Sequence, residues 1–396
     1  MGVVLVSNTA GSTSPPTVAL ICDVGVGPGR DIIRGATRFA NLRRKWALRM
    51  DLLSRSMARA LPECDGAIIA GDDQGKFEFV ASRCKHVVRV SSVGDPSVCP
   101  IVTVDNAAAG RLAAEHLLGL GLNHYAYLGW DFDGLDHQRH TGFSERLAES
   151  GFRDIASTVP WGPWETTITH AHHPVMMEWI ESLPKPVGLL AVDDLVANDL
   201  ALACLKYEVA VPERVTIISI DDDTLLCESA WPPISSVRCD FRRAGYEAAR
   251  LLERLIDGEE LSESERHLKL PPMCVTERQS TDIAAIEDPS LAEALRYIRH
   301  HACDPCSVKD VLRYVPVSRR WLETQFQTHL SRSPHMEIAR VRMETGSRLL
   351  LQAEWSMDEI ARRCGFASVQ SFTKAFRNAT GETPARYRRR RLQGSH

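Results

Sequence analysis

Apolar, β-branched segments alternate with amphipathic segments through residues 17–280 of this 396-residue chain. Residues 17–24 (TVALICDV) have the composition of a strand buried on both faces, and residues 31–44 that follow have helical periodicity. Strand and helix alternation at this spacing predicts parallel sheets built from right-handed βαβ units. Over this length it predicts two doubly wound lobes that face a cleft, since ligands of such sheets bind beyond the carboxyl ends of the strands.

The alternation stops near residue 281, and every later segment has the pattern of a helix. We expect four regions: a flexible lead (1–16), an α/β effector domain (17–280), a linker (281–289) and an all-α domain (290–396). From residue 283 onward the chain has 19 Lys and Arg against 12 Asp and Glu, whereas the first 282 residues have 28 against 39. An acidic body with a basic module indicates a polyanionic partner; a merely solvated basic surface is the alternative.

The all-α region contains two copies of one motif. A shift of 50 residues pairs Ser318 with Ser368, Leu322 with Phe372, Phe326 with Phe376, and Pro334 with Pro384. A capping-box pattern precedes each copy, at Ser307 with Asp310 and at Ser356 with Glu359. Each copy is therefore predicted to be helix, turn, helix.

The second helix of each copy has one apolar and one polar face. Such a helix can bury its apolar face and present the polar face to the major groove of DNA. The predicted contacts are Arg319, Arg320, Glu323, Thr324 and Gln327 in the first copy, and Gln370, Ser371, Lys374 and Arg377 in the second. A helix over about residues 334–352 would span roughly 25 to 30 Å, which approaches the separation of successive major-groove windows. A solvated helical hairpin is the alternative.

Residues 360–388 (IARRCGFASVQSFTKAFRNATGETPARYR) resemble the signature of the AraC/XylS family of transcription regulators. The matching positions are Gly365, Phe366, Ser371, Phe372, Phe376, Gly381, Thr383, Pro384, Tyr387 and Arg388. The resemblance extends over residues 288–392 and implies base contacts at Arg320, Glu323, Thr324, Val369, Gln370 and Lys374. The first copy departs from the family at Ser331, where a glycine like Gly381 is usual.

Acidic residues follow several predicted strands of the α/β region. Carboxylates accept pairs of hydroxyl donors, an Arg donates to sugar oxygens and an aromatic face stacks on C–H patches, so the set predicts a sugar pocket. The candidates are Asp23, Arg30, Asp72, Trp130, Asp193, Asp194 and Asp221. A helix N-cap is the alternative for each Asp, because each precedes a predicted helix.

Residues 17–280 resemble the effector domain of LacI/GalR regulators and periplasmic sugar-binding proteins. The resemblance rests on segments such as VTVDNAAAGRLAAEHLLGLG, RHTGFSERL, AVDDLVANDLALA and VPERVTIISIDD. It implies that Arg139, Asp193, Asp194 and Asp221 touch the sugar, with Asp193 standing where the family commonly has Asn. Together the two resemblances imply a sugar-responsive transcription regulator, with a pentose such as xylose as the candidate effector.

Other sites have weak sequence support. Residues 25–29 (GVGPG) lack the GxGxxG spacing, and Pro28 removes an N–H that a phosphate would need. Cys303 and Cys306 form a lone CxxC, and the His residues at 170, 172 and 173 lie in a polar loop. No serine nucleophile elbow or Walker loop occurs. We therefore expect no enzyme activity, no metal and no cofactor.

The remaining expectations concern partners and location. The start of the chain has no signal-peptide pattern, and no apolar run is long enough for a membrane span, so we expect a cytoplasmic protein without a membrane partner. The expected partners are double-stranded operator DNA, a sugar, a second copy in a homodimer and RNA polymerase. Two alternatives stay open: an enzyme acting on a sugar or nucleotide with an accessory DNA-binding module, and a constitutive DNA-binding protein with a vestigial cleft.

Overall fold

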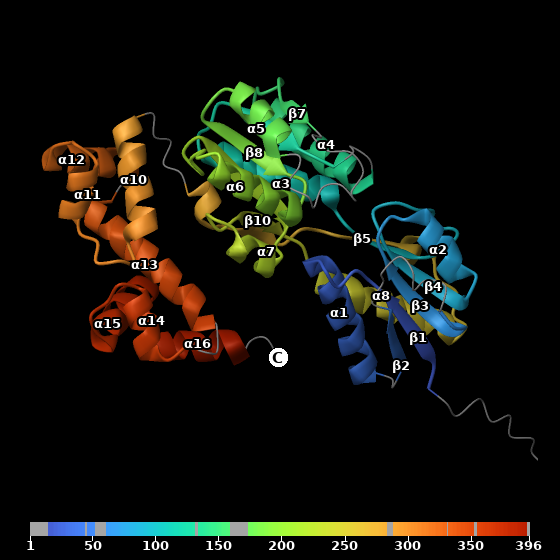
Figure 1. Ribbon diagram of the computed structural model, residues 1–396. Coiled ribbons are helices and arrows are strands. Elements are labelled where there is room, and N and C mark those ends of the chain that lie inside the picture. Colours follow the sequence, from blue (N-terminus) through green and yellow to red (C-terminus); the bar gives the residue numbers. More distant parts are fainter. Residues whose placement is uncertain are drawn as a thin grey trace, which may run out of the picture. The chain divides into compact units, whose positions relative to one another are not determined.

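The protein forms two compact units, Met1–Asp282 and Ile283–His396. The computed structural model describes residues 15–43, 46–51, 61–130, 134–158, 173–282, 288–330, 332–351 and 355–393. The first unit is α/β and the second is helical (Figure 1). The predicted fold class is confirmed, while most of the predicted lead and linker, and Ser331, fall outside the described residues.

The first lobe of the α/β unit is built on a six-stranded parallel sheet in the order β11-β5-β4-β3-β1-β2. The strands are β1 (Thr17–Ile21), β2 (Ala47–Asp51), β3 (Cys64–Ala70), β4 (Cys84–Val90), β5 (Ile101–Val104) and β11 (His267–Leu270). The helices are α1 (Gly27–Arg43), α2 (Gln74–Ala81), α8 (Phe241–Ile256) and the short α9 (Glu263–Arg266).

The second lobe has a matching sheet in the order β12-β10-β9-β8-β6-β7, in which only the edge strand β12 is antiparallel among the described strands. Its strands are β6 (Tyr125–Leu128), β7 (Ala156–Thr158), β8 (Val187–Ala191), β9 (Val215–Asp221), β10 (Ser235–Arg238) and β12 (Cys274–Thr276). Its helices are α3 (Asn106–Gly119), α4 (Gly134–Glu149), α5 (His173–Ser182), α6 (Asp194–Lys206), α7 (Thr224–Ser229) and the 3₁₀ turn η3 (Gln279–Thr281). The chain enters this lobe after β5, leaves it after β10 and returns after β11.

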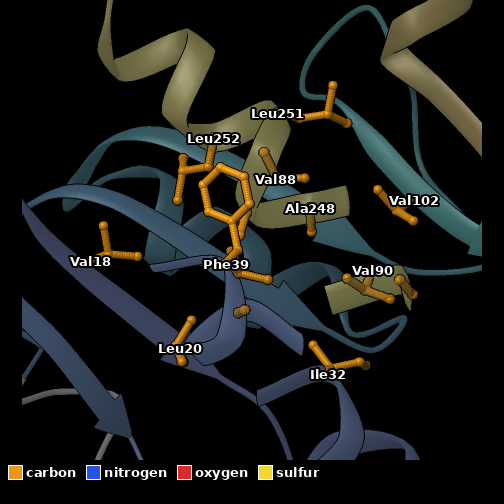
Figure 2. Packing of buried hydrophobic residues seen from close by; sticks show 14 of the residues in the cluster. Val18, Leu20, Ile32, Phe39, Val88, Val90, Val102, Ala248, Leu251 and Leu252 are labelled. Carbon is orange, nitrogen blue, oxygen red and sulfur yellow. The ribbon is translucent and has the colours of Figure 1, made fainter. Parts of the chain in front are cut away.

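The core of the first lobe lies between its sheet and the pair α1 and α8. Phe39 of α1 lies among Val18, Val88 and Leu252 in this cluster (Figure 2). The two helices approach closely, because a Cβ built on Gly245 of α8 would lie 2.0 Å from the carbonyl oxygen of Ile32. Only glycine permits this backbone approach.

Helix α1 begins four residues earlier than the sequence pattern predicted, at Gly27 instead of Asp31. Pro28 falls in its first turn, where the missing N–H costs nothing and the fixed φ favours a helix. The glycine-rich segment 25–29 is therefore partly helical.

The second unit consists of α10 (Pro289–His301), α11 (Val308–Tyr314), α12 (Arg319–Leu330), α13 (Pro334–Leu351), α14 (Met357–Arg363), α15 (Val369–Thr380) and α16 (Pro384–Gln393). Both predicted capping boxes form: Ser307 N donates to Asp310 Oδ2 over 2.9 Å, and Ser356 N donates to Glu359 Oε2 over 2.9 Å. Helix α13 contributes Val341 to the core of the first copy and Leu350 to that of the second. One long helix thus joins two small cores.

Arginine side chains fix both ends of α13. The carboxylate of Glu337, in the first turn of α13, is buried and paired with Arg332 and Arg340. At the other end, Arg388 of α16 donates to the carbonyl oxygens of Leu350 and Trp355 over 2.9 and 2.8 Å. Arg388, the first of four consecutive arginines (388–391), is therefore used for internal contacts.

Candidate functional site

A cavity of about 260 Å³ lies in the α/β unit, at the carboxyl ends of strands from both lobes. Six of the predicted ligand residues line it: Asp23, Asp72, Arg139, Asp193, Asp194 and Asp221. Thr103, Asn106, Ser91, Ser92 and Phe241 are among the other lining residues, and none of these was in the predicted set. The position of the cavity agrees with the rule that ligands of parallel sheets bind where the strands end.

Arg139 of α4 is held in one orientation by three acceptors. Nε donates to Asn106 Oδ1 over 3.0 Å, Nη1 to the carbonyl oxygen of Val192 over 2.6 Å, and Nη2 to Asp221 Oδ1 over 2.6 Å. Burial alone would lower the pKa of Arg139, but the charge of Asp221 outweighs it and holds that pKa above its usual range. The cavity therefore has a fixed positive charge in its wall.

Asp193 has two functions that the sequence presented as alternatives. Its Oδ1 caps α6 by accepting from Val196 N over 2.9 Å, and its Oδ2 accepts from Trp130 Nε1 over 3.0 Å. The side chain faces the cavity instead of bulk water, and burial raises its pKa to about 6. An N-cap role thus coexists with a place in the cavity wall.

The neighbouring Asp194 is more deeply buried, with 2% of its surface exposed. Its Oδ1 accepts from the hydroxyls of Ser219 and Ser236 over 2.5 and 2.7 Å, and its Oδ2 from Asp223 N over 2.5 Å. Burial raises the pKa of Asp194 to about 7. Because the protein itself supplies these donors, Asp194 supports the end of β9 at the base of the cavity.

The first lobe contributes Asp72 and Asp23. Asp72 accepts from Ser91 Oγ over 2.7 Å and from Ser92 N over 3.0 Å, and Ser92 Oγ also contacts it. Asp23 is exposed at the end of β1 and accepts from Gly25 N over 2.8 Å. Asp72 is thus fixed by the loop after β4, whereas Asp23 retains a solvent-facing carboxylate.

Arg30 is outside the cavity wall and forms an ion pair between the lobes. Its Nη2 lies 2.8 and 2.7 Å from the two carboxylate oxygens of Asp223, and Gly27 N donates to Asp223 Oδ2 over 2.7 Å. Asp223, the last of the three acidic residues at the end of β9, itself lines the cavity. Trp130 also lies outside the wall and reaches it through Asp193.

The polar faces predicted for α12 and α15 are exposed. Arg319, Arg320, Glu323, Thr324 and Gln327 are exposed on α12, as are Gln370, Ser371, Lys374 and Arg377 on α15. The apolar residues Leu322, Phe326, Phe372 and Phe376 are buried beneath them. Val369 differs, since it is half-buried and packs against the core that contains Phe372.

Two of these exposed side chains form contacts with neighbouring residues of the same segment. Arg319 Nε lies 2.9 Å from Glu323 Oε1, and Ser371 Oγ lies 2.9 Å from Ser368 Oγ within the helix cap. Gly381, with φ of 78°, ends α15 in the left-handed conformation that glycine favours. The second copy therefore has a complete helical cap at both ends.

The described part of the chain contains no group of three or more His, Cys, Asp or Glu positioned to hold a metal ion. His173 pairs with Asp199 at 2.9 Å, while the His residues at 170 and 172 lie outside the described residues. Among the described helices, none is both long and apolar enough to span a membrane.

Comparison with known proteins identifies both units. A family model described as a periplasmic binding protein-like domain matches residues 114–281, and a helix-turn-helix domain matches residues 311–390. The xylose operon regulatory protein of Escherichia coli (strain K12) is 33% identical over 336 residues, which cover 82% of this chain and 83% of that protein. The chain belongs to the family of the xylose operon regulatory protein.

Two further comparisons agree. The xylose operon regulatory protein of Haemophilus influenzae is 31% identical over 297 residues, covering 73% of this chain and 74% of that protein. The solved structure of a xylose-binding transcription activator has a TM-score of 0.79 at 28% identity and covers 95% of this chain and 98% of that one. As a member of this family, the protein is a sugar-responsive, DNA-binding transcription regulator of the AraC type and not an enzyme.

Proposed function

We propose that the effector is an aldopentose of the xylose type and that it binds in the cavity between the two lobes. The observation that carries the proposal is the fixed pair of Arg139 and Asp221 in a wall that also contains Asp193. A guanidinium donates to ring and hydroxyl oxygens and carboxylates accept from hydroxyls, so this wall suits a neutral polyol. The name of the related xylose-binding transcription activator supports xylose as the first sugar to test.

The proposed roles follow the geometry. Arg139, Asp193 and Asp221 contact the sugar from the second lobe, and Asp23 and Asp72 contact it from the first. Asp194 holds the base of the cavity, Trp130 orients Asp193, and Arg30 ties the lobes together through Asp223. Since both lobes contribute to the wall, a bound sugar would favour the conformation in which they are closed.

The output is DNA binding by the second unit in the cytoplasm. We propose that the exposed faces of α12 and α15 enter successive major grooves of an operator half-site, and that a homodimer occupies two such half-sites. Contact with RNA polymerase would then turn binding into regulation. A sugar acts as a switch only if its affinity differs between the conformations, and coupling factors of about 5 to 150 are typical.

The test is an operator-binding assay with the full chain. Affinity for DNA from upstream of the protein's own gene and of the adjacent genes is measured by fluorescence anisotropy with D-xylose, L-arabinose, D-ribose, D-glucose or no sugar. We expect D-xylose to change the dissociation constant at least about fivefold.

One control variant and one stability measurement make the assay specific. Asp221→Asn should abolish the sugar effect while DNA affinity without sugar is retained. If D-xylose neither alters DNA affinity nor raises the thermal stability of the protein, the proposed effector is wrong. A ligand at 100 times its dissociation constant should add about 2.7 kcal/mol to the free energy of unfolding.

A further inference from the structure

Three consecutive acidic residues at the end of β9 each pair with a different arginine. Asp221 pairs with Arg139 at 2.6 Å, Asp222 with Arg278 at 2.8 Å and Asp223 with Arg30 at 2.7 Å. These arginines lie in the cavity wall on α4, in the segment after β12, and on α1 of the first lobe, respectively. One short turn therefore contacts the cavity, the opposite lobe and the segment that leads out of the first unit.

The backbone of this turn has an uncommon conformation. Asp221 has φ of 117° and Asp222 has φ of 59°, a region that residues other than glycine seldom occupy. Hydrogen bonds to two buried side chains hold it in place: Asp222 N donates to Ser236 Oγ over 3.0 Å, and Asp223 N donates to Asp194 Oδ2 over 2.5 Å. Backbone strain of this kind persists only where the surroundings enforce it, and it concentrates at switch regions.

Residues 276–282, here called the exit segment, are the last residues of the first unit before the DNA-binding unit. Thr276 Oγ1 donates to Asp222 Oδ2 over 2.7 Å, and the guanidinium of Arg278 faces Oδ1 of the same carboxylate. The side chains of Asp222 and Arg278 are 5% and 11% exposed. A movement of Asp222 must therefore move or release the exit segment.

The exit segment is fastened to the same part of the second lobe by further bonds. Arg278 N donates to Ser235 Oγ over 2.7 Å, and Arg278 Nη1 donates to the carbonyl oxygen of Ile234 over 2.9 Å. Ser280 Oγ donates to the carbonyl oxygen of Ile217, on β9 itself, over 2.6 Å. The segment is thus placed by the strands β9 and β10 that also carry the acidic turn.

We propose that Asp222 is a positioning residue that couples the sugar cavity to the exit segment. This inference rests on the proposed function. Sugar contact at Asp221, or closure of the lobes on Asp223, shifts the acidic turn, and Asp222 passes the shift to Thr276 and Arg278. Asp222 does not line the cavity, so its effect on DNA binding runs through these two partners.

Asp222→Asn in the full chain tests the coupling. The substitution keeps the size of the side chain and an oxygen for Thr276 but removes the charge that faces Arg278. Two quantities are measured: the dissociation constant for D-xylose by calorimetry, and the ratio of DNA dissociation constants with and without saturating D-xylose. We expect the ratio to move at least about fivefold toward 1, because coupling of this kind is commonly 5-fold to 150-fold. The D-xylose dissociation constant should change less than about threefold.

The control Glu247→Gln breaks an ion pair with Arg250 of 2.7 Å within α8 and should leave the ratio at its wild-type value. Thr276→Val removes one hydrogen bond to Asp222 and should move the ratio toward 1 even if Asp222→Asn does not fold. If Asp222 and Arg278 act as one unit, Asp222→Asn combined with Arg278→Gln should lose no more coupling than Asp222→Asn alone.

The outcomes separate the two proposals. A wild-type protein whose DNA affinity is unchanged by D-xylose overturns the proposed effector and this coupling together. A wild-type protein that responds, with Asp222→Asn or Thr276→Val variants that are folded and respond equally, overturns the coupling alone.

Discussion

The indole N–H of Trp130 donates to Oδ2 of Asp193 over 3.0 Å. Trp130 is itself held by the buried carboxylate of Asp136, which accepts from Trp130 N over 2.5 Å and from the hydroxyl of Tyr127 over 2.5 Å. The orientation of Asp193 in the cavity wall therefore depends on a second acid that has no place in the wall. In this position the Asp193 carboxylate is buried, and burial destabilises its charged form.

The pH dependence of stability should report this cost. Burial raises the pKa of Asp193 to about 6 from an ordinary value of 3.8, so the folded protein binds a proton there more tightly than the unfolded chain. The favourable contribution is complete below pH 3.8 and is lost as pH rises through 6. Asp193→Asn cannot ionise, so its Tm relative to wild type should increase between pH 4 and pH 7.

The difference is at most on the order of 3 kcal/mol, as a shift of about two pKa units implies. It is measured by thermal unfolding of both proteins without sugar in buffers of equal ionic strength. A Tm difference that stays constant over this pH range would show that Asp193 is not the group that titrates.

Because α1 and α8 approach closely at Gly245, we expect any side chain larger than glycine to destabilise the protein there. Its added Cβ would lie 2.0 Å from the carbonyl oxygen of Ile32, an atom of the backbone that cannot turn away. Gly245→Ala should therefore lower the free energy of unfolding by about 1 to 3 kcal/mol or more, as overpacked cores do.

Gly119 in the last turn of α3 provides the matched control. No atom lies within 4 Å of a Cβ added there, so Gly119→Ala should be neutral or stabilising by up to about 1 kcal/mol. Urea denaturation of both variants decides the matter, and equal losses at the two positions would contradict the packing argument.

The buried carboxylate of Glu337 should make the stability of the DNA-binding unit depend on pH. Burial works against its charge, but the hydrogen bond and the charge of Arg340, with the charges of Arg332 and Arg299, outweigh it and lower the pKa of Glu337. Its stabilising contribution is therefore present above its ordinary pKa and is lost as pH falls through the lowered value. Glu337→Gln should destabilise this unit by about 1 to 3 kcal/mol at pH 7, because it removes the buried charge that pairs with Arg332 and Arg340.

Asp358→Asn is the control for Glu337→Gln. Asp358 pairs with Arg362 at 2.9 Å on the surface of α14, where both side chains are about two-thirds exposed, and such pairs contribute about 0.5 kcal/mol or less. Thermal unfolding of the C-terminal unit is measured for both variants, and we expect a larger decrease in Tm for Glu337→Gln than for Asp358→Asn. A similar small loss in both would mean that the buried carboxylate has no special importance.

The sequence predicted features that depend on local spacing. Phe372 and Phe376 are buried because they recur on one helical face, and Ser356 with Glu359 forms a cap because both lie within one turn. It could not distinguish Asp193 from Asp194, since these neighbours have the same chemistry and differ only in what lies opposite them.

Distant partners explain the remaining differences. Asp194 accepts hydrogen bonds from Ser219 of β9 and Ser236 of β10. Arg30 of α1 pairs with Asp223, which is almost 200 residues away in the sequence. Such pairings depend on how the two lobes meet at the cleft. No periodicity in a single segment encodes that arrangement, which is why Arg30 was expected in the wall and instead pairs with Asp223 across the lobes.

Helix α15 allows a test that separates affinity from specificity. Lys374 and Gln370 are both exposed on the face opposite Phe372 and Phe376, but their chemistry differs. If Lys374 contacts a phosphate, Lys374→Ala should weaken binding similarly for all operator variants and reduce the slope of log K against log salt by about 0.9. Gln370→Ala should instead relax the preference at one base pair by about 1 to 3 kcal/mol and leave the salt slope unchanged, because an amide reads a base edge without neutralising a phosphate. Titrations at several salt concentrations with single-base operator variants measure both effects. Arg388→Ala differs from both variants, because it breaks contacts to Leu350 and Trp355 and should first lower the Tm of the protein. A Gln370→Ala variant with an unchanged base preference would remove Gln370 from the recognition surface and leave α15 with a purely electrostatic role.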